Sequence, residues 1–383
     1  MKRTSTHLYK LSVGLLLAPI VLIAILILLH WLGWINAWQF PLIPVSAFCI
    51  FGSFASLALA GAWPWRSRAG ARTRGDRWRQ RPRSVLSLAL VVVLLVVNLP
   101  PYLVAHYVTQ VRSPGQLILG RPRPENDTNP SDRGLVYVTH RLRSERNIEL
   151  ESWEIKTTTQ PRGTVLLFPG NLSTKSKLLA QAEQFVNLGF DVVLTDFRSV
   201  GGSTGKITTA GISEAKDVVA VFNHLKAQKF SQDHPTSPVI LYGISMGTAA
   251  ILRAIFQYQI QPDAIILELP FARLLDSVKS RLRYRKVPTF PIAELLLFWA
   301  FVQRGVNGFG HNPVTFARAV NCPTLVLQGA QDQWITVEEV TAIVDNFAGP
   351  KQLVIFPDAG HHQLLSVNRE RWRSTVASFL ANL

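Results

Sequence analysis

The first third of the chain consists of long apolar runs, whereas the rest alternates short apolar runs with amphipathic ones. Residues 11–34, 41–63 and 84–105 are each apolar for about the 20 residues that a helix needs to cross a bilayer. A cleaved signal peptide has a shorter apolar stretch and a small-residue cleavage site, but tryptophans follow the first run here. The pattern therefore predicts three transmembrane helices within a membrane anchor, residues 1–106.

Basic residues predict the orientation of this anchor. The loop between the second and third runs carries eight arginines against the single Asp76, and Lys2, Arg3 and Lys10 precede the first run. Such positive segments stay in the cytoplasm. We therefore expect a cytoplasmic N-terminus and an extracytoplasmic C-terminal part, in a bacterial inner membrane. The arginine loop lies between two spans, so membrane lipids rather than nucleic acid are its expected partners, despite the net charge of +16.

The pattern changes after the anchor. Residues 107–134 are rich in Pro, Gly, Asn and Asp and predict an irregular linker. From residue 135, GLVYVTHRL and IELESWEIK alternate apolar and polar positions, as half-buried antiparallel strands do. Continuous apolar runs then recur between amphipathic segments, which is typical of a mostly parallel sheet with helices on both faces. The expected strands are 164–170, 190–197, 238–244, 263–269, 323–329 and 351–357, and the expected helices are 173–188, 212–228, 246–258 and 364–381.

The alternation breaks between residues 270 and 317, where two helices surround a Pro-rich turn. An insertion of this length between core strands is typically functional. Ligands of open α/β sheets bind at the carboxyl ends of the strands. We therefore expect a helical cap over this edge of a domain that covers residues 135–383.

The motif with the most specific chemistry is GISMG, residues 243–247. It lies between an expected strand and an expected helix, as a nucleophile elbow requires. Gly243 and Gly247 allow strand and helix to approach without a Cβ clash. Ser245 would then be exposed at a helix N-terminus, where negative charge is favoured. The alternative is that Ser245 is a helix N-cap.

A serine nucleophile needs a base, and the base needs an acid that orients it. The chain order in this architecture is Ser, acid, His. Asp332 follows the strand 323–329, and His361 follows the strand 351–357. We therefore predict a Ser245–His361–Asp332 triad. Alternatives remain for each partner: Asp332 as a helix cap, Asp358 or Glu268 as the acid, and His362 as the base.

An oxyanion hole needs two backbone amides. The first is expected from Met246, the residue after the nucleophile, and the second from the loop that follows strand 164–170. That loop reads FPGNLSTK, and Gly170 lets its backbone approach closely. We choose the amide of Asn171 as the second donor, with a simple turn as the alternative.

Five motifs in this order, FPGN, DFRSVGGSTG, GISMG, GAQD and GHH, resemble the α/β-hydrolase superfamily. They are most similar to its membrane-tethered serine hydrolases with a short helical cap, near the serine-aminopeptidase and monoacylglycerol-lipase groups. The resemblance covers about residues 135–383 and implies the α/β-hydrolase fold. It also implies that DFRSVGGSTG buttresses the oxyanion side. One departure is Pro169, where many members have a histidine before the glycine.

The expected activity is hydrolysis of a carboxylic ester, of lipid or other acyl origin, because the cap is apolar and the chain is tethered to a membrane. The expected partners are a small-molecule or lipid ester and membrane lipids. A peptidase or amidase is the alternative enzyme, although its pocket needs an acidic residue and the cap is basic. A non-catalytic binding protein is the alternative from another class. Cys49 and Cys322 have no metal-ligand spacing, so neither a metal nor an organic cofactor is expected.

Overall fold

The computed structural model describes residues 76–231 and 237–383. These residues belong to two compact units. One contains residues 76–107 and 115–119, and the other contains residues 108–114 and the described part of 120–383. The two units are therefore described separately.

The helix α3 (Asp76–Thr109) contains the third expected span. Its segment Ala89–Thr109 is long and apolar enough to cross a membrane, with a mean hydropathy of 2.0. The helix continues past the expected end at residue 105. The other two expected spans, 11–34 and 41–63, lie outside the described residues.

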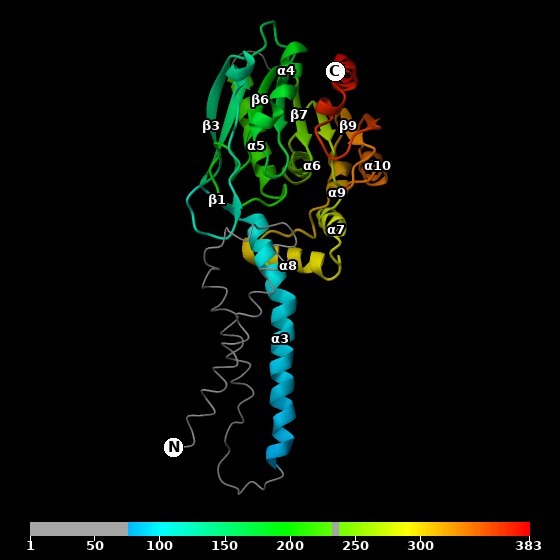
Figure 1. The fold of residues 1–383 in the computed structure, drawn as a ribbon. Helices are drawn as coiled ribbons and strands as arrows, with labels where there is room; N and C mark the ends of the chain where they lie inside the picture. Colours follow the sequence, from blue (N-terminus) through cyan, green and yellow to red (C-terminus); the bar gives the residue numbers. More distant parts are fainter. Residues whose placement is uncertain (1–75, 232–236) are drawn as a thin grey trace. The chain divides into compact units, whose positions relative to one another are not determined.

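An eight-stranded sheet forms the centre of the second unit, in the order β10-β9-β8-β7-β5-β6-β4-β3. Strands β5 to β10 pair in parallel, whereas β3 and β4 pair antiparallel at one edge (Figure 1). The strands are β3 (Tyr137–Glu145), β4 (Ile148–Ile155), β5 (Thr164–Phe168), β6 (Asp191–Thr195), β7 (Val239–Ile244), β8 (Ala264–Glu268), β9 (Thr324–Gly329) and β10 (Lys351–Phe356). All strands expected from the sequence are present, at the bounds expected within a few residues.

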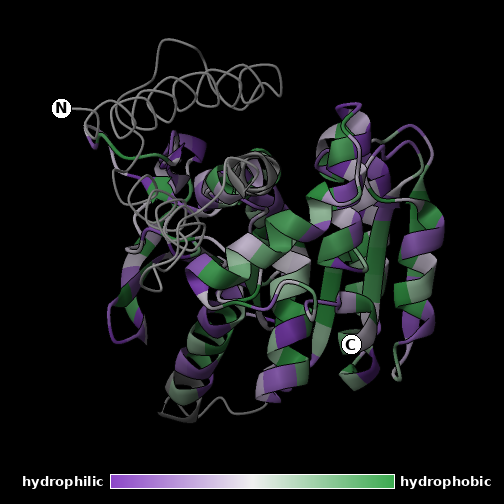
Figure 2. Cartoon of the chain, turned by 90° about the horizontal axis from the view of Figure 1, so that it is seen from below, coloured by the Kyte–Doolittle hydropathy of each residue, from purple (hydrophilic) through white to green (hydrophobic). Residues whose placement is uncertain are grey.

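Two hydrophobic clusters cover the two faces of the sheet, which explains the continuous apolar runs of the central strands. In β5, Leu166 packs on one face and its neighbours Val165 and Leu167 on the other. Both faces of the central sheet are therefore buried, as in other parallel sheets. The strand ribbons in Figure 2 are mostly green, the colour of hydrophobic residues. The first face carries α5 (Glu214–Ser231), α6 (Met246–Tyr258) and α10 (Val337–Asp345), and the second carries α4 (Leu179–Asn187), α11 (Leu364–Val367) and α12 (Arg369–Ala381).

Three segments differ in detail from the expectation. The helix expected over 364–381 divides at Asn368, whose side chain accepts the amide of Arg371 and caps a new helix. The helix expected over 173–188 begins as a 3-10 turn, η2 (Lys175–Leu178). The segment 107–134 holds more regular structure than an irregular linker: β1 (Val111–Arg112) pairs with β2 (Arg121–Pro122), and η1 (Pro130–Arg133) follows.

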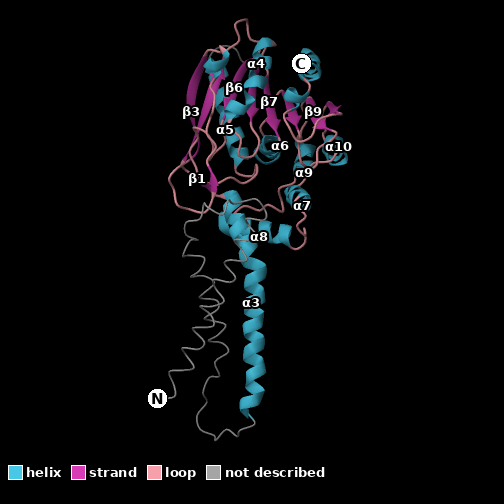
Figure 3. Ribbon diagram, viewed as in Figure 1, coloured by secondary structure: helices cyan, strands magenta, loops and turns pink. Residues whose placement is uncertain are grey.

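The insertion between β8 and β9 forms two helices as expected, α7 (Leu274–Tyr284) and α8 (Ile292–Arg304), followed by the short α9 (Pro313–Phe316). An ion pair of 2.8 Å between Lys279 and Glu294 joins α7 to α8, whose ribbons are labelled in Figure 3. Gly305 ends α8 in the left-handed conformation, with φ 68°, which glycine adopts without a Cβ penalty.

Candidate active site

Ser245 occupies a strained turn between β7 and α6. Its φ of 51° and ψ of −111° lie outside the regions that a serine normally adopts. A Cβ on Gly243 would lie 2.7 Å from the carbonyl carbon of Gly247, so β7 and α6 come too close for a side chain there, and a Cβ on Gly247 would lie 2.5 Å from the carbonyl oxygen of Phe168 at the end of β5. The turn therefore has the geometry of a nucleophile elbow, which exposes the serine hydroxyl above the sheet.

The structure brings the three predicted triad residues together. Ser245 Oγ lies 3.1 Å from Nε2 of His361, and Nδ1 of His361 lies 2.7 Å from Oδ2 of Asp332. The three residues follow the carboxyl ends of β7, β10 and β9. By contrast, the alternatives Asp358 and His362 have exposed side chains. The arrangement allows His361 to accept the serine proton while Asp332 orients its imidazole.

Asp332 is held as an ionised acceptor. Its side chain is fully buried, and its Oδ1 accepts the amides of Trp334 and Ile335 at 2.9 and 3.1 Å. Burial raises the pKa of Asp332, but the hydrogen bonds from His361 and from these amides outweigh burial and hold the pKa below its usual value. Asp332 is thus charged at neutral pH and can stabilise a protonated His361.

The loop expected to supply the second oxyanion donor lies beside the nucleophile. A Cβ on Gly170 would lie 3.8 Å from Cβ of Ser245, and the amides of Asn171 and Met246 belong to the segments that flank this contact. The carboxylate of Asp196 holds the end of this loop in place. It accepts hydrogen bonds from the backbone amide and the side-chain ammonium of the buried loop residue Lys175, at 2.7 and 2.5 Å.

The motif DFRSVGGSTG is anchored at a second point as well. Arg198 donates from Nη2 to Oδ1 of the fully buried Asp217, at 2.7 Å. Its Nη1 donates to Glu145 at 2.6 Å. Hydrogen bonds to Arg198 oppose the desolvation that raises the pKa of Asp217. The motif therefore holds its neighbours through buried charge pairs, which agrees with the structural role that the resemblance implied.

The sequence indicated Glu268 as a structural residue or an alternative acid, but it did not predict which groups this carboxylate binds next to the site. This carboxylate is fully buried and accepts the Tyr242 hydroxyl at 2.6 Å, the Trp372 indole at 3.1 Å and the Leu364 amide at 2.7 Å. Burial raises its pKa. Leu364 follows His361 by three residues, so Glu268 holds the loop that carries the base. A lone glutamate at the end of an apolar strand was the signal in the sequence.

Two aromatic and cationic contacts connect the cap to the triad, and the sequence did not reveal them. The ring of Trp334 lies 5.0 Å from the ring of His361, and the guanidinium of Arg281 on α7 lies 5.0 Å from the centre of Trp334. A cation at this distance over an indole is attracted to its face. The cap therefore reaches His361 through Trp334.

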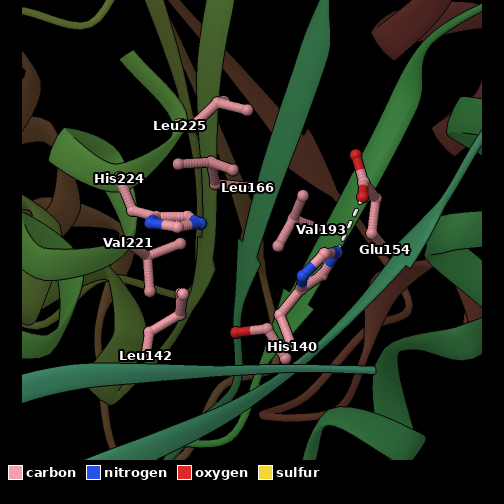
Figure 4. A pocket seen from close by; sticks show the side chains of 9 residues that line it. His140, Leu142, Glu154, Leu166, Val193, Val221, His224 and Leu225 are labelled. Atoms are coloured by element: carbon pink, nitrogen blue, oxygen red, sulfur yellow. Dashed lines mark hydrogen bonds and ion pairs between the residues drawn. The ribbon is translucent and has the colours of Figure 1, made fainter. Parts of the chain in front are cut away.

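Figure 4 shows a pocket away from these residues, between β3, β4 and α5. Apolar side chains line most of it, and His140 points toward Glu154, with Nε2 2.8 Å from Oε2. None of the three triad residues lines this pocket. We therefore assign it no part in the chemistry at Ser245.

Comparison with known proteins shows similarity to one family over part of the chain. Residues 159–307 match the family described as serine aminopeptidase, S33. Among solved structures, an esterase of Pyrococcus furiosus, Pf2001, superimposes with a TM-score of 0.56 and 23% identity, covering 68% of this chain and 96% of that chain. The chain therefore has the α/β-hydrolase fold.

Curated relatives of the chain include both uncharacterized proteins and lipases. The uncharacterized protein YqkD of Bacillus subtilis is 27% identical over 57% of this chain and 72% of its own length. Lysophosphatidylserine lipase ABHD12 of Xenopus tropicalis is 27% identical over 66% of this chain and 71% of its own length.

Proposed function

We propose that this α/β-hydrolase is a membrane-anchored serine hydrolase that cleaves carboxylic esters. The observation that carries the proposal is the continuous chain of contacts from Ser245 Oγ through the His361 imidazole to the buried carboxylate of Asp332. These groups stand at the carboxyl edge of the sheet, where such folds bind ligands.

The proposed reaction has two steps. Ser245 Oγ attacks the ester carbonyl while Nε2 of His361 takes its proton, and the amides of Asn171 and Met246 bind the oxyanion. His361 then donates the proton to the leaving alcohol, which leaves an acyl group on the serine. A water molecule attacks this acyl group while His361 takes its proton, and His361 returns that proton to Ser245 Oγ as the acyl–oxygen bond breaks and the acid is released. Asp332 keeps the imidazole proton on Nδ1 throughout.

The proposed substrate is an acyl ester of lipid origin. Two features support it: the ABHD12 relative is a lysophosphatidylserine lipase, and the cap helix α8 is apolar between Glu294 and Gln303. The description of the matching family favours an aminopeptidase as the second candidate. That activity requires an acidic group to hold the substrate's amino terminus, whereas the cap places the cation Arg281 next to Trp334.

We also propose that the hydrolase domain lies outside the cytoplasm of a bacterial inner membrane. The candidate span Ala89–Thr109 and the eight arginines between residues 66 and 83 support this orientation. Protease added to spheroplasts, in which the outer face of the inner membrane is accessible, should then degrade the domain. A domain that is protected as fully as a cytoplasmic marker would contradict the orientation.

The substrate proposal is tested with p-nitrophenyl esters of graded acyl length and with aminoacyl anilides. We expect the full-length wild type to hydrolyse the esters and Ser245→Ala to fall to the background rate. Faster hydrolysis of the anilides would favour the aminopeptidase. Equal ester hydrolysis by wild type and Ser245→Ala would refute the proposed chemistry.

A further inference from the structure

The cap helix α8 carries an apolar stripe on its exposed face. Phe298, Phe301 and Val302 are 46%, 49% and 53% exposed. Because residues three and four apart lie side by side on a helix, these three side chains form one continuous patch. A surface helix normally turns charged and polar residues outward, so the exposed face of α8 departs from the pattern of a helix in water.

Charge is absent from the middle of this stripe. The only ionisable residues of α8 are Glu294 in its first turn and Arg304 at its end, and Glu294 pairs with Lys279 of α7. Phe290 before α8 is 76% exposed and Phe309 after it is 43% exposed. Single exposed apolar residues are ordinary, but a contiguous group of them marks a binding surface.

The end of α8 is fixed at the point where the candidate span ends. Arg304 Nε donates to Thr109 Oγ1 at 2.9 Å. Thr109 is the last residue of the apolar helical segment Ala89–Thr109. If this segment crosses the bilayer, Thr109 lies where the chain leaves it, and the hydrogen bond holds Arg304 at the membrane surface. The last residue of the apolar stripe, Val302, lies two residues before Arg304.

The end of α7 and the turn after it supply positive charge that complements anionic headgroups. Arg283 and Tyr284, in the last turn of α7, and the following Arg285 and Lys286 form this basic turn; all four are exposed, and residues 281–293 contain no acidic residue. Basic residues next to a membrane are attracted to anionic headgroups, and tyrosine is enriched at the membrane interface. A basic turn followed by an apolar helix is the composition of an interfacial segment.

We propose that α8 lies in the interface of the lipid bilayer, with Phe298, Phe301 and Val302 among the upper acyl chains and the basic turn against anionic headgroups. This rests on the membrane anchoring in the proposed function. The cap then meets the same bilayer that holds its lipid substrate. Arg281 of the cap contacts Trp334, and Trp334 contacts the ring of His361. A chain of side-chain contacts therefore connects the cap that carries the docked face to the catalytic base.

The test places a fluorophore on this face of the full-length protein. Cys49→Ser and Cys322→Ser remove the native thiols, Phe301→Cys introduces one on α8, and an environment-sensitive dye is attached. The protein is reconstituted at one copy per nanodisc containing phosphatidylglycerol. The matched control is Val138→Cys on β3, where the native side chain is 56% exposed.

We expect the dye at position 301 to be quenched by lipids that carry a nitroxide near the headgroup and to be protected from iodide in water. The dye at position 138 should show the reverse. Quenching at position 301 by iodide alone would show that α8 faces water, and protection from both quenchers would show that another part of the chain covers it. Either result overturns the proposal.

Activity and location of the same labelled proteins separate this inference from the function on which it rests. Protein that fails to enter nanodiscs contradicts the anchoring and the inference together. Inserted protein that hydrolyses a soluble short-chain ester but lacks quenching by lipid contradicts the inference alone. Inserted and quenched protein without esterase activity contradicts only the proposed chemistry.

A functional variant tests the consequence for the substrate. Loss of a large apolar side chain from an interface weakens its partitioning about tenfold. We therefore expect Phe301→Ser to lower the hydrolysis of a long-chain ester embedded in vesicles by up to about tenfold, with no change on a soluble short-chain ester. The control Val138→Ser should leave both rates unchanged. Equal losses on both substrates would show a structural effect of Phe301→Ser and overturn the proposal.

Discussion

Replacing Asp332 with asparagine tests the orienting role of the buried acid with almost no change of shape. Oδ1 of Asp332 accepts two backbone amides, at 2.9 and 3.1 Å. The amide oxygen of the new side chain must keep that position, because its NH₂ group cannot accept these hydrogen bonds. The NH₂ group is therefore forced into the position of Oδ2, which lies 2.7 Å from Nδ1 of His361.

The consequence for His361 follows from this placement. An NH₂ group donates to Nδ1, so the imidazole proton moves to Nε2, which then faces Ser245 Oγ at 3.1 Å as a donor. The base can no longer accept the serine proton. The corresponding change in a serine protease lowers kcat by about four orders of magnitude, which corresponds to about 5 kcal/mol in the activation barrier. We expect a loss of this size.

The assay is steady-state hydrolysis of a soluble p-nitrophenyl ester by the full-length protein, with far-UV circular dichroism as the check of folding. The matched control is Asp358→Asn, which alters an exposed carboxylate close to His361 in sequence and should leave kcat unchanged. A folded Asp332→Asn protein within tenfold of wild type would refute this account. A large loss in Asp358→Asn would instead identify Asp358 as the acid.

Three further changes test the packing around the site. Gly247→Ala should lower the free energy of unfolding by about 1–3 kcal/mol, as overpacking does, because its new Cβ would lie 2.5 Å from a carbonyl oxygen. The control is Gly170→Ala, whose Cβ would have its nearest neighbour at 3.7 Å. Equal midpoints of the two variants in urea denaturation would contradict this prediction. Glu268→Ala removes the acceptor of three buried donors, which should lower the free energy of unfolding by about 1–3 kcal/mol for each donor left unpaired. Glu268→Gln should lower it less. An unchanged Tm in Glu268→Ala would refute the supporting role of this carboxylate. Burial lowers the pKa of His311 from 6.5 to about 3, so the folded state keeps it neutral while the unfolded chain binds a proton. Stability should therefore fall as pH drops from about 6.5 toward 3, by about 2 kcal/mol at pH 5, and His311→Gln should flatten this slope in thermal denaturation; identical slopes would contradict it.

The core of the hydrolase domain could be predicted from the sequence because burial on both faces leaves a simple signature. Strands such as β5 and β7 are continuous apolar runs since alternate side chains enter two different hydrophobic clusters. The helix α6 was predicted at its observed bounds, Met246–Tyr258, because the glycine pattern and the apolar run before it fix where it starts.

Contacts between distant side chains were not predictable in the same way. Asn126 bonds to Asp196, and Arg123 donates to carbonyl oxygens of residues 203 and 205 at 2.5 Å. These bonds order part of a segment whose composition predicted an irregular linker. Composition reports local preference, whereas these bonds join residues about 70 to 82 positions apart.

The candidate site shows the same division. The positions of Ser245, Asp332 and His361 at strand ends followed from the order of motifs, because parallel strands bring their carboxyl ends to one edge. The buried support from Glu268 and the link from Arg281 through Trp334 to His361 depend on side-chain packing across three elements. No spacing in the sequence reports such packing.

The most direct test of the central claim is covalent labelling with a fluorophosphonate probe, which reacts only with an activated serine. Membranes that contain the full-length wild type, Ser245→Ala or His361→Ala are treated with the probe and compared at equal protein amounts. The account predicts strong labelling of the wild type and none of either variant. Equal labelling of wild type and Ser245→Ala, or no labelling of the wild type, would contradict it.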